Sequence, residues 1–311
     1  MKIIPLKIKN DVKLQMVEAV CPTSPLTPII ACDFYIYKAE DWKEVPGGYQ
    51  KGRVLNIDHH ADVPRMEHNI TSTNLAIDRI RQCGPPDAES IVVINHTDCD
   101  SILSAAIMSC KIQPDEIFGK AAIAADHTGE ENSTADMLQG IKEHDDIEMS
   151  LRNLNLLLHG HPLEYKAQQG LVDRRRKRVE ASHLLISFSS IDGIYYATLD
   201  EDTDSEFFPA LLPDAVLILL SVPSTNSGKS IIKLRVGLAA PEGFSIHSLK
   251  INSFDHGFDH GYGGRWNAGS NKRSGGTSKH IEKYVEELSI KLKSCLTSKH
   301  PTGILGSVPI T

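Results

Sequence analysis

The sequence predicts an α/β fold, in which a domain built on a parallel sheet is followed by a smaller α/β domain. Short aliphatic runs alternate with helical patterns over the first two thirds of the chain, which is typical of parallel sheets. Each of three early aliphatic runs ends in Asp or His residues. The chain has 311 residues, 41% of them hydrophobic, and at this length a single core usually gives way to two.

The first domain is expected to alternate strands with helices. The strand candidates are aliphatic runs bounded by polar, Gly or Pro residues, at 28–33, 53–58 and 90–96. The helix candidates carry apolar residues three and four positions apart, at 72–82, 101–112 and 133–144. The first twenty residues are expected to form a hairpin that turns at Asn10 and Asp11.

The second half of the chain begins with a helical, charge-rich stretch at about 145–185. Its basic run RRRKR, at 174–178, is predicted to be a solvated helix face. Strand-like runs at 194–199, 215–222 and 230–238 precede a Gly-rich loop at 257–276 and an amphipathic helix at 280–296. We therefore predict a first domain over 1–150, a helical linker over 151–190 and a second domain over 191–311.

Charge and cysteine usage exclude several classes of protein. The formal charge is -7, with 33 Lys and Arg against 40 Asp and Glu, so the average surface repels a long nucleic-acid duplex. Small phosphorylated ligands and short single strands stay compatible with this charge, because cations can reverse its sign locally. The six cysteines are scattered, which favours a reducing cytoplasm. No signal-peptide core and no aliphatic run of membrane-spanning length is found, so no membrane partner is expected.

Four polar clusters are expected to meet where ligands bind in parallel sheets, at the carboxyl ends of the strands. They comprise Asp33; Asp58, His59 and His60; His96, Asp98 and Asp100; and Asp126. Carboxylates this close together cannot all stay ionised unless cations compensate their charge. A mixed carboxylate and imidazole set suits Mn²⁺, with Mg²⁺, Co²⁺ or Zn²⁺ as alternatives, and two ions sharing a carboxylate hydrolyse phosphoryl groups. Taken singly, each cluster could instead be a helix cap or a turn.

These motifs resemble those of the DHH phosphoesterase superfamily, whose name matches the tripeptide at 58–60. The sequence HTDCDS at 96–101 is similar to the family's first motif, ACD at 31–33 to the second, and IAADHTG at 123–129 to the fourth. The order here is second, third, first, fourth, as if the chain were circularly permuted. The resemblance covers about residues 28–145 and, in the second domain, about 225–295.

The resemblance implies a metal-dependent phosphoesterase with two Mn²⁺ ions, for which Mg²⁺ or Co²⁺ could substitute. Asp33 would bridge the two ions. The other implied ligands are His96 and Asp98 for one ion, and His59, Asp100 and Asp126 for the second. Asp58 would orient His59 or His60, and His60 would contact the substrate phosphate or the leaving oxygen. His127 could be a ligand or face solvent.

The segment GYGGRWNAGS at 261–270 resembles the family's GGGH motif, which binds the phosphate or nucleotide end of the substrate. Glycines let backbone N–H groups approach an anion closely. Arg265 stands where the family has His, and a guanidinium there could steady the phosphoryl group. The other substrate-binding candidates are Gly263, Gly264, Trp266 as a base-stacking ring, Asn267, Lys272 and Arg273. The alternative is a flexible surface turn.

The expected function is two-metal hydrolysis of short oligonucleotides or nucleotide phosphoesters. An inorganic pyrophosphatase or exopolyphosphatase is the alternative enzyme, and a catalytically idle nucleotide-binding regulator is the alternative from another class. The expected partner is therefore a small phosphorylated substrate or a short single-stranded oligonucleotide, and a homodimer is one option for assembly.

Overall fold

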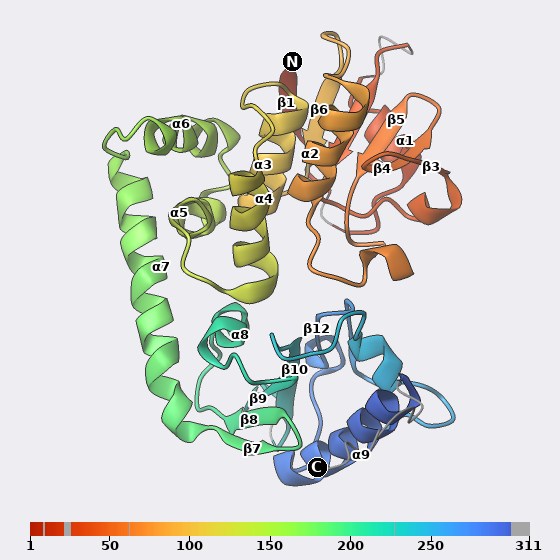
Figure 1. The fold of residues 1–311 in the computed structure, drawn as a ribbon, viewed down its shortest axis with the longest axis vertical. Coiled ribbons are helices and arrows are strands. Elements are labelled where there is room, and N and C mark those ends of the chain that lie inside the picture. The colour runs from red at the N-terminus through yellow and green to blue at the C-terminus, as the bar shows by residue number, and fades with distance from the viewer. Residues whose placement is uncertain (9, 22–25, 62, 227, 300–311) are drawn as a thin grey trace, which may run out of the picture. The chain divides into compact units, whose positions relative to one another are not determined.

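The computed structural model describes residues 1–8, 10–21, 26–61, 63–226 and 228–299. The chain divides into two compact units (Figure 1). The first unit runs from Met1 to His183 and also includes Glu206–Leu211, and the second contains Leu184–Ser205 and the chain from Leu212 onward. Each unit has a six-stranded sheet and helices, so the predicted α/β class is confirmed.

The first unit contains a mixed sheet with the strand order β1-β6-β2-β5-β4-β3. Four strands run parallel: β1 (Lys2–Pro5), β6 (Ile91–Ile94), β2 (Ile29–Cys32) and β5 (Val54–Ile57). At one edge, β4 (Gly48–Lys51) and β3 (Lys43–Val45) form an antiparallel hairpin. The three predicted strands are confirmed as the buried centre of this sheet, in which β2 and β5 are buried along their whole length.

The predicted N-terminal hairpin is wrong. Residues 2–5 pair in parallel with β6, about ninety residues away, and the short helix α1 (Leu14–Glu18) follows. A local turn at Asn10 and Asp11 therefore does not return the chain to its own first strand. The backbone donors and acceptors of β1 are satisfied by the distant strand instead.

Several helices of the first unit begin at polar caps. They are α2 (Ser72–Cys83), α3 (Cys99–Met108), α4 (Glu116–Ile123), α5 (Ser133–Ile141) and α6 (Ile147–Leu158). The unit also contains α7 (Tyr165–His183) and the short α8 (Phe208–Leu211). The Thr71 side chain caps α2 together with Asn74, and Asp98 caps α3 by accepting the Ser101 N–H. Every residue of α3 is buried, so its N-terminal polar side chains lie in the protein interior.

The cluster around Asp126 does not follow a strand, contrary to expectation. Helix α4 passes directly into a single π-helical turn, Ala124–Thr128, which carries Asp126 and His127. The residues IAA before Asp126 form a short apolar run that packs inside the unit as part of a helix. Such a run has the same sequence pattern in a buried helix as in a buried strand, which is why a strand was expected here. Such π turns insert one residue into a helix and are frequent at functional sites.

The basic run at 174–178 is not a fully solvated face, because two of its arginines point inward. Arg174 is 6% exposed, its guanidinium lies 4.1 Å from the ring centroid of Phe207, and it bonds to Glu206. Arg178 donates to Asp136 at 2.8 Å. Residues four apart share a helix face, so this pair binds the segment Glu206–Leu211 to the first unit.

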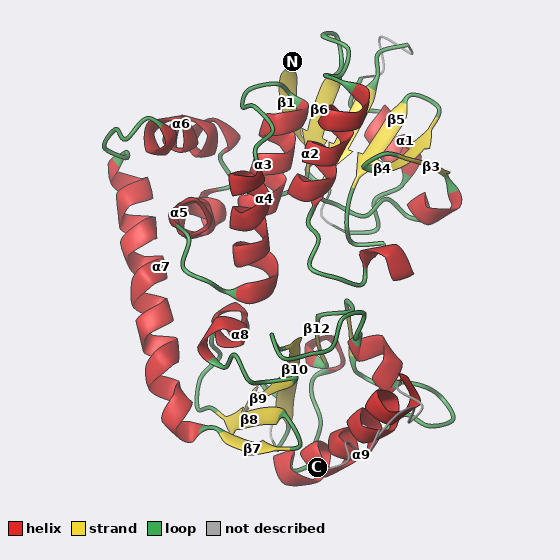
Figure 2. Cartoon of the chain, viewed as in Figure 1, coloured by secondary structure: helices red, strands yellow, loops and turns green. Residues whose placement is uncertain are grey.

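The second unit pairs a sheet with one long helix (Figure 2). Its strands, in sheet order, are β11 (Gly263–Gly264), β12 (Ala268–Ser270), β10 (Ser230–Val236), β9 (Leu217–Pro223), β8 (Ile194–Thr198) and β7 (Ser189–Ile191). Helix α9 (Ile281–Lys299) contributes Tyr284 and Leu288 to a core with Leu219 and Leu234. Among the helices in the described part of the chain, none has the length and apolar character needed to cross a membrane.

Candidate metal centre

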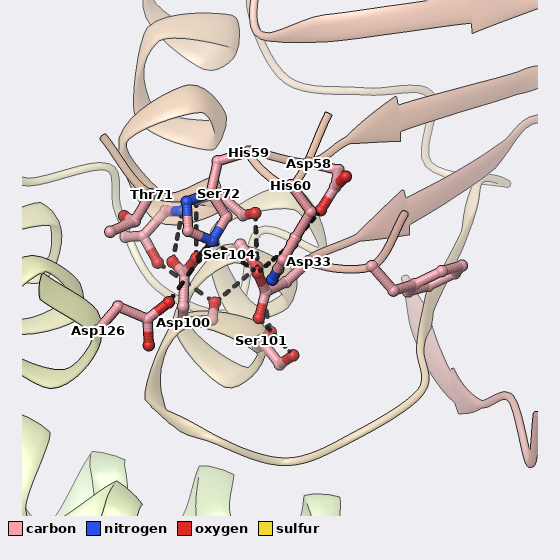
Figure 3. Close-up of polar contacts among 12 residues, drawn as sticks. Asp33, Asp58, His59, His60, Thr71, Ser72, Asp100, Ser101, Ser104 and Asp126 are labelled. Carbon is pink, nitrogen blue, oxygen red and sulfur yellow. Dashed lines mark hydrogen bonds and ion pairs between the residues drawn. The ribbon is translucent and has the colours of Figure 1, made fainter. Parts of the chain in front are cut away.

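Three neighbouring parallel strands of the first unit bring their following residues to one edge of the sheet. Strand β2 lies between β5 and β6. Asp33 follows β2, the DHH tripeptide at 58–60 follows β5, and residues 95–98 follow β6. Because Asp33 follows the central strand, its carboxylate can reach side chains from both neighbours. Figure 3 shows it among the polar residues of this edge.

Asp33 is held in an unusual conformation by two serines. Its φ is +59°, a left-handed value that costs a non-glycine residue roughly 1 kcal/mol. The side chain is 1% exposed, and its two oxygens accept different hydroxyls: Ser72 Oγ donates to Oδ1 at 2.9 Å and Ser101 Oγ to Oδ2 at 2.8 Å. The backbone strain and the two hydroxyls together fix this carboxylate between its neighbours.

A first ligand group surrounds one oxygen of Asp33. His96 Nε2 lies 3.2 Å from Asp33 Oδ2 and 3.2 Å from Asp98 Oδ2. The opposite ring nitrogen of His96, Nδ1, bonds to the Asn95 side-chain oxygen at 2.6 Å. This bond orients the ring so that Nε2 points at the two carboxylates.

A second ligand group surrounds the other oxygen of Asp33. His59 Nε2 lies 3.6 Å from Asp33 Oδ1, 3.6 Å from Asp100 Oδ2 and 3.5 Å from Asp126 Oδ2. His59 Nδ1 donates to the Ile70 carbonyl at 2.8 Å, so Nε2 is again the atom that faces the acids. The π-helical turn after α4 thus delivers Asp126 to the same point that the strand ends reach.

Asp100 is fixed by the N-terminus of α2. Its Oδ2 accepts the Ser72 N–H and its Oδ1 accepts the Thr73 N–H, both at 2.7 Å. These amide donors belong to the first turn of the helix, where backbone N–H groups have no partner within the helix. The two amides therefore fix the position of the Asp100 carboxylate beside His59.

His60 and Asp58 form a hydrogen-bonded pair beside Asp33, since His60 Nδ1 also lies 3.8 Å from Asp33 Oδ1. His60 Nδ1 donates to Asp58 Oδ1 at 2.6 Å, and the His60 side chain is 26% exposed. Burial acts to raise the pKa of Asp58, but the charge and hydrogen bond of His60 keep it below its ordinary value. The sequence allowed either His59 or His60 as the residue that Asp58 orients, and in the structure this residue is His60.

The donor set fits divalent cations. Three sets of side chains each place their ligand atoms within 4.8 Å of one another: Asp33, His59 and His60; His59, Asp126 and His127; and Asp33, His96 and Asp98. Without a cation, burial and the charges of Asp100 and Asp98 raise the pKa of Asp33 well above its ordinary value. Burial lowers the pKa of His96, but Asp98 and Asp33 outweigh it and raise that pKa to about 11. In the metal-free protein, protons bound to Asp33 and His96 therefore compensate the negative charge that cations would otherwise compensate.

Cation binding is expected to release protons and to strengthen as the pH rises. His96 has an ordinary pKa of 6.5 and a folded-state pKa of about 11, so its proton stabilises the metal-free fold at neutral pH and is lost only as the pH rises through 11. A cation must displace that proton. We expect the apparent affinity for Mn²⁺ to rise about tenfold per pH unit for each proton displaced. Calorimetric titrations in buffers of different ionisation enthalpy count these protons, and an affinity independent of pH would contradict the assignment.

In the second unit, the glycine-rich segment forms a tight hairpin. β11 and β12 are antiparallel, and the Arg265 N–H donates to the Ala268 carbonyl at 2.7 Å, which closes the turn. A Cβ atom on Gly264 would lie 2.2 Å from the Gly269 Cα, so the strands can approach this closely only with glycine. A Cβ atom on Gly263 would instead have no other atom within 4 Å, and both glycines of β11 are exposed. The exposed backbone could receive an anion.

The side chains that follow these glycines differ in their access to solvent. Trp266 is 9% exposed and Asn267 is 5% exposed, so both lie largely in the interior of the unit. An indole buried to this extent offers little surface for a base, and we therefore expect no stacking on Trp266. Lys272 and Arg273 are exposed, and Lys272 Nζ lies 3.7 Å from Asp202 Oδ2.

Several residues that shape the centre were missed from the sequence. They are the hydroxyls of Ser72 and Ser101, the side chain of Asn95, and the backbone groups of Ile70 and Thr73. A serine at the start of a helix looks like an ordinary cap, and a backbone carbonyl leaves no trace in sequence. The available signal was position, because both serines open the helices that follow the polar motifs.

Comparison with known proteins gives similarities in structure only. No family model and no curated protein matches the chain. Similar solved structures include a pGpG-specific phosphodiesterase from Vibrio cholerae, with 11% identity over 71% of this chain and 87% of the other and a TM-score of 0.38. An exopolyphosphatase-related protein from Bacteroides fragilis shares 14% identity over 92% of this chain and 76% of the other, with a TM-score of 0.38.

RecJ from Thermus thermophilus, in a structure with Mn²⁺, is a third similar protein, with 11% identity and a TM-score of 0.39. The similarity covers 97% of this chain and 45% of RecJ. At these identities and TM-scores, the assignment of substrate, metal and residue roles depends on the geometry of the centre itself.

Proposed function

We propose that this protein is a metal-dependent hydrolase of phosphoric esters that acts on short oligonucleotides or nucleotide phosphoesters. The observation that carries the proposal is the position of Asp33. One of its oxygens lies 3.2 Å from His96 Nε2 and the other lies 3.6 Å from His59 Nε2. A carboxylate placed between two imidazoles, each with further acids beside it, suits a pair of cations that share one ligand.

The side chains divide between the two cations as follows. Asp33 would be shared, His96 and Asp98 would hold one cation, and the second would be held by His59, Asp100 and Asp126. When bound, two divalent cations would lower the pKa of a water molecule and neutralise charge on the phosphoryl oxygens. Mn²⁺ is the proposed ion because it accepts both imidazole and carboxylate ligands.

His60 is proposed to act on the substrate. It is partly exposed, and Asp58 bonds to its Nδ1, which leaves Nε2 on the opposite side of the ring. In its protonated form, His60 would donate a hydrogen bond from Nε2 to the phosphoryl or leaving oxygen, and the ionised Asp58 would stabilise the imidazolium. The buried residues of the centre cannot serve this role, because Asp33 and Asp100 are at most 1% exposed.

The substrate class is proposed from the second unit. The exposed backbone of β11 and the Arg265 side chain would bind the phosphate of a nucleotide. One observation favours the alternative of pyrophosphate or polyphosphate: Trp266 is buried, while Lys272 and Arg273 are exposed, so this region offers cations without an exposed indole.

An assay of Mn²⁺-dependent product formation tests the proposal. The substrates would be RNA and DNA of two to five residues, bisphosphate nucleosides, cyclic dinucleotides, pyrophosphate and polyphosphate. Turnover of the oligonucleotides or nucleotides supports the proposal, and turnover of pyrophosphate or polyphosphate alone selects the alternative enzyme. No turnover, with fewer than about one Mn²⁺ per chain, would indicate the nucleotide-binding regulator, because the proposed hydrolysis needs a metal pair.

Replacing Arg265 with Ala is expected to raise KM and leave kcat nearly unchanged. The guanidinium would hold a phosphate that does not react, and such a contact is the same in the ground state and the transition state. A charged hydrogen bond of about 1.5 kcal/mol corresponds to a rise in KM of roughly tenfold. Steady-state kinetics check this, with Arg175→Ala, an exposed arginine on α7, as the matched control. A fall in kcat with KM unchanged would show that the role of Arg265 is misassigned.

A further inference from the structure

Two histidines share one backbone carbonyl beside the candidate metal centre. The Ile70 carbonyl oxygen lies 2.8 Å from His59 Nδ1 and 3.0 Å from His127 Nε2. A carbonyl can only accept, and it has two lone pairs, so both ring nitrogens carry a hydrogen. The two imidazoles lie edge to face with centroids 5.6 Å apart, and His127 is 5% exposed. His127 therefore does not face solvent.

We propose that His127 is a positioning residue, which holds the Ile70 carbonyl and thereby fixes the tautomer and orientation of His59. With its hydrogen on Nδ1, His59 turns Nε2 toward Asp33, Asp100 and Asp126. This inference rests on the proposed function, since it treats His59 as a cation ligand. Partners that orient a ligating histidine typically raise metal affinity 10- to 100-fold, and we expect His127 to contribute about that much.

The position of Ile70 explains why holding its carbonyl matters. Ile70 begins a four-residue segment, 70–73, at the start of α2. The next residues bond to two acids of the centre: Ser72 Oγ donates to Asp33, and the Ser72 and Thr73 amides donate to Asp100. His127 comes from the π-helical turn after α4, so its bond joins a separate element to this segment. Loss of that bond would loosen several groups of the centre at once.

A direct ligand role for His127 is the competing interpretation. The ligand atoms of His59, Asp126 and His127 lie within 4.8 Å of one another. The hydrogen bond from His127 Nε2 to the Ile70 carbonyl excludes Nε2 as the ligand atom, because a nitrogen that donates a hydrogen cannot also offer its lone pair to a cation, so a ligand role would have to use Nδ1. The two roles differ in what a substitution does to the number of bound ions.

Titration of Mn²⁺ into the full-length wild type, H127A and H127Q tests the proposal, with ions counted by electron paramagnetic resonance and affinities measured by calorimetry. We expect two ions in all three proteins. H127A should weaken one ion about 10- to 100-fold and change the other less than about twofold. H127Q should recover most of the loss, because its amide N–H reaches the place of Nε2. The exposed His161→Ala is the control and should match the wild type.

Two outcomes of this titration would overturn the proposal. Loss of one ion at saturating Mn²⁺, without recovery in H127Q, would make His127 a ligand. Equal affinities in all variants would mean that it has no role in cation binding.

A metal-free measurement separates failure of this inference from failure of the proposed function. If the wild type binds no Mn²⁺, the proposed function fails, but the imidazole ¹⁵N spectrum of the metal-free protein still reports the hydrogen on Nδ1 of His59. That hydrogen should be protected in the wild type and in H127Q and should exchange faster in H127A. Equal exchange in all three would overturn the inference on its own.

Discussion

Replacing Asp33 with Asn is expected to abolish turnover and yet to raise the melting temperature of the metal-free protein. Asn tolerates the positive φ of this position and keeps the shape of the side chain, but it removes the charge that both ligand groups share. Loss of the shared ligand should lower kcat by about a thousandfold or more, which corresponds to about 4 kcal/mol of transition-state stabilisation.

The expected gain in stability follows from the pKa of Asp33. Burial and the charges of Asp100 and Asp98 raise this pKa, so the ionised carboxylate destabilises the metal-free fold. Stability is therefore lost as the pH rises through the folded-state pKa of Asp33, and Asn avoids that loss. The difference in melting temperature should grow with pH and disappear in acid, where Asp33 is protonated.

Thermal unfolding of both proteins with and without Mn²⁺ measures this effect. A difference of about 1 kcal/mol in the free energy of unfolding should shift the melting temperature by roughly 2–4 °C. Added Mn²⁺ should stabilise the wild type and leave D33N unchanged. The control is Asp78→Asn, an exposed carboxylate on α2 that should alter neither quantity. Two results would reject the shared-ligand role of Asp33. One is normal turnover in D33N, and the other is a metal-free D33N protein that is less stable than the metal-free wild type at every pH.

Replacing His60 with Ala is expected to lower kcat by about 10²- to 10³-fold while both cations stay bound. The side chain is proposed to donate a hydrogen bond to the reacting phosphoryl group, and groups that transfer or share a proton in the transition state contribute amounts of this size. Kinetics measured together with a count of Mn²⁺ per chain test this. Loss of an ion from H60A would instead make His60 a ligand, in the set that it forms with Asp33 and His59.

The partner variant Asp58→Asn separates orientation from direct contact. Asp58 holds His60 through a 2.6 Å hydrogen bond and does not itself face the substrate, because it is 1% exposed. D58N should lower kcat less than H60A, and the double variant should be no worse than H60A alone, since residues that act as one unit are not additive. Fully additive losses would mean that the two side chains act separately.

The sequence predicts the edge where this centre lies, because Asp33, the DHH tripeptide and HTDCDS each follow an aliphatic run directly. Once those runs are strands of one parallel sheet, their ends must meet. The hydrophobic pattern alone does not give the order of the strands in the sheet. Asp33 lies in the middle because β2 pairs with both β5 and β6, and these pairings are long-range contacts.

Other features escaped the sequence for reasons of local geometry. A π turn differs from a helix or a buried run by one residue, which hydrophobic periodicity does not resolve, so Asp126 was expected after a strand. The N-terminal strand β1 finds its partner in β6, and Arg174 finds its partners on a segment some thirty residues later. For β1 and Arg174 the deciding contact is distant along the chain, and local propensity carries no information about it.

Anomalous diffraction from crystals grown with Mn²⁺ tests the central claim most directly. We expect two peaks per chain at the carboxyl edge of the first sheet, both in contact with Asp33. One should also contact His96 and Asp98, and the other His59 and Asp126. A single peak, or two peaks of which only one touches Asp33, would contradict the shared carboxylate on which the proposed hydrolysis depends.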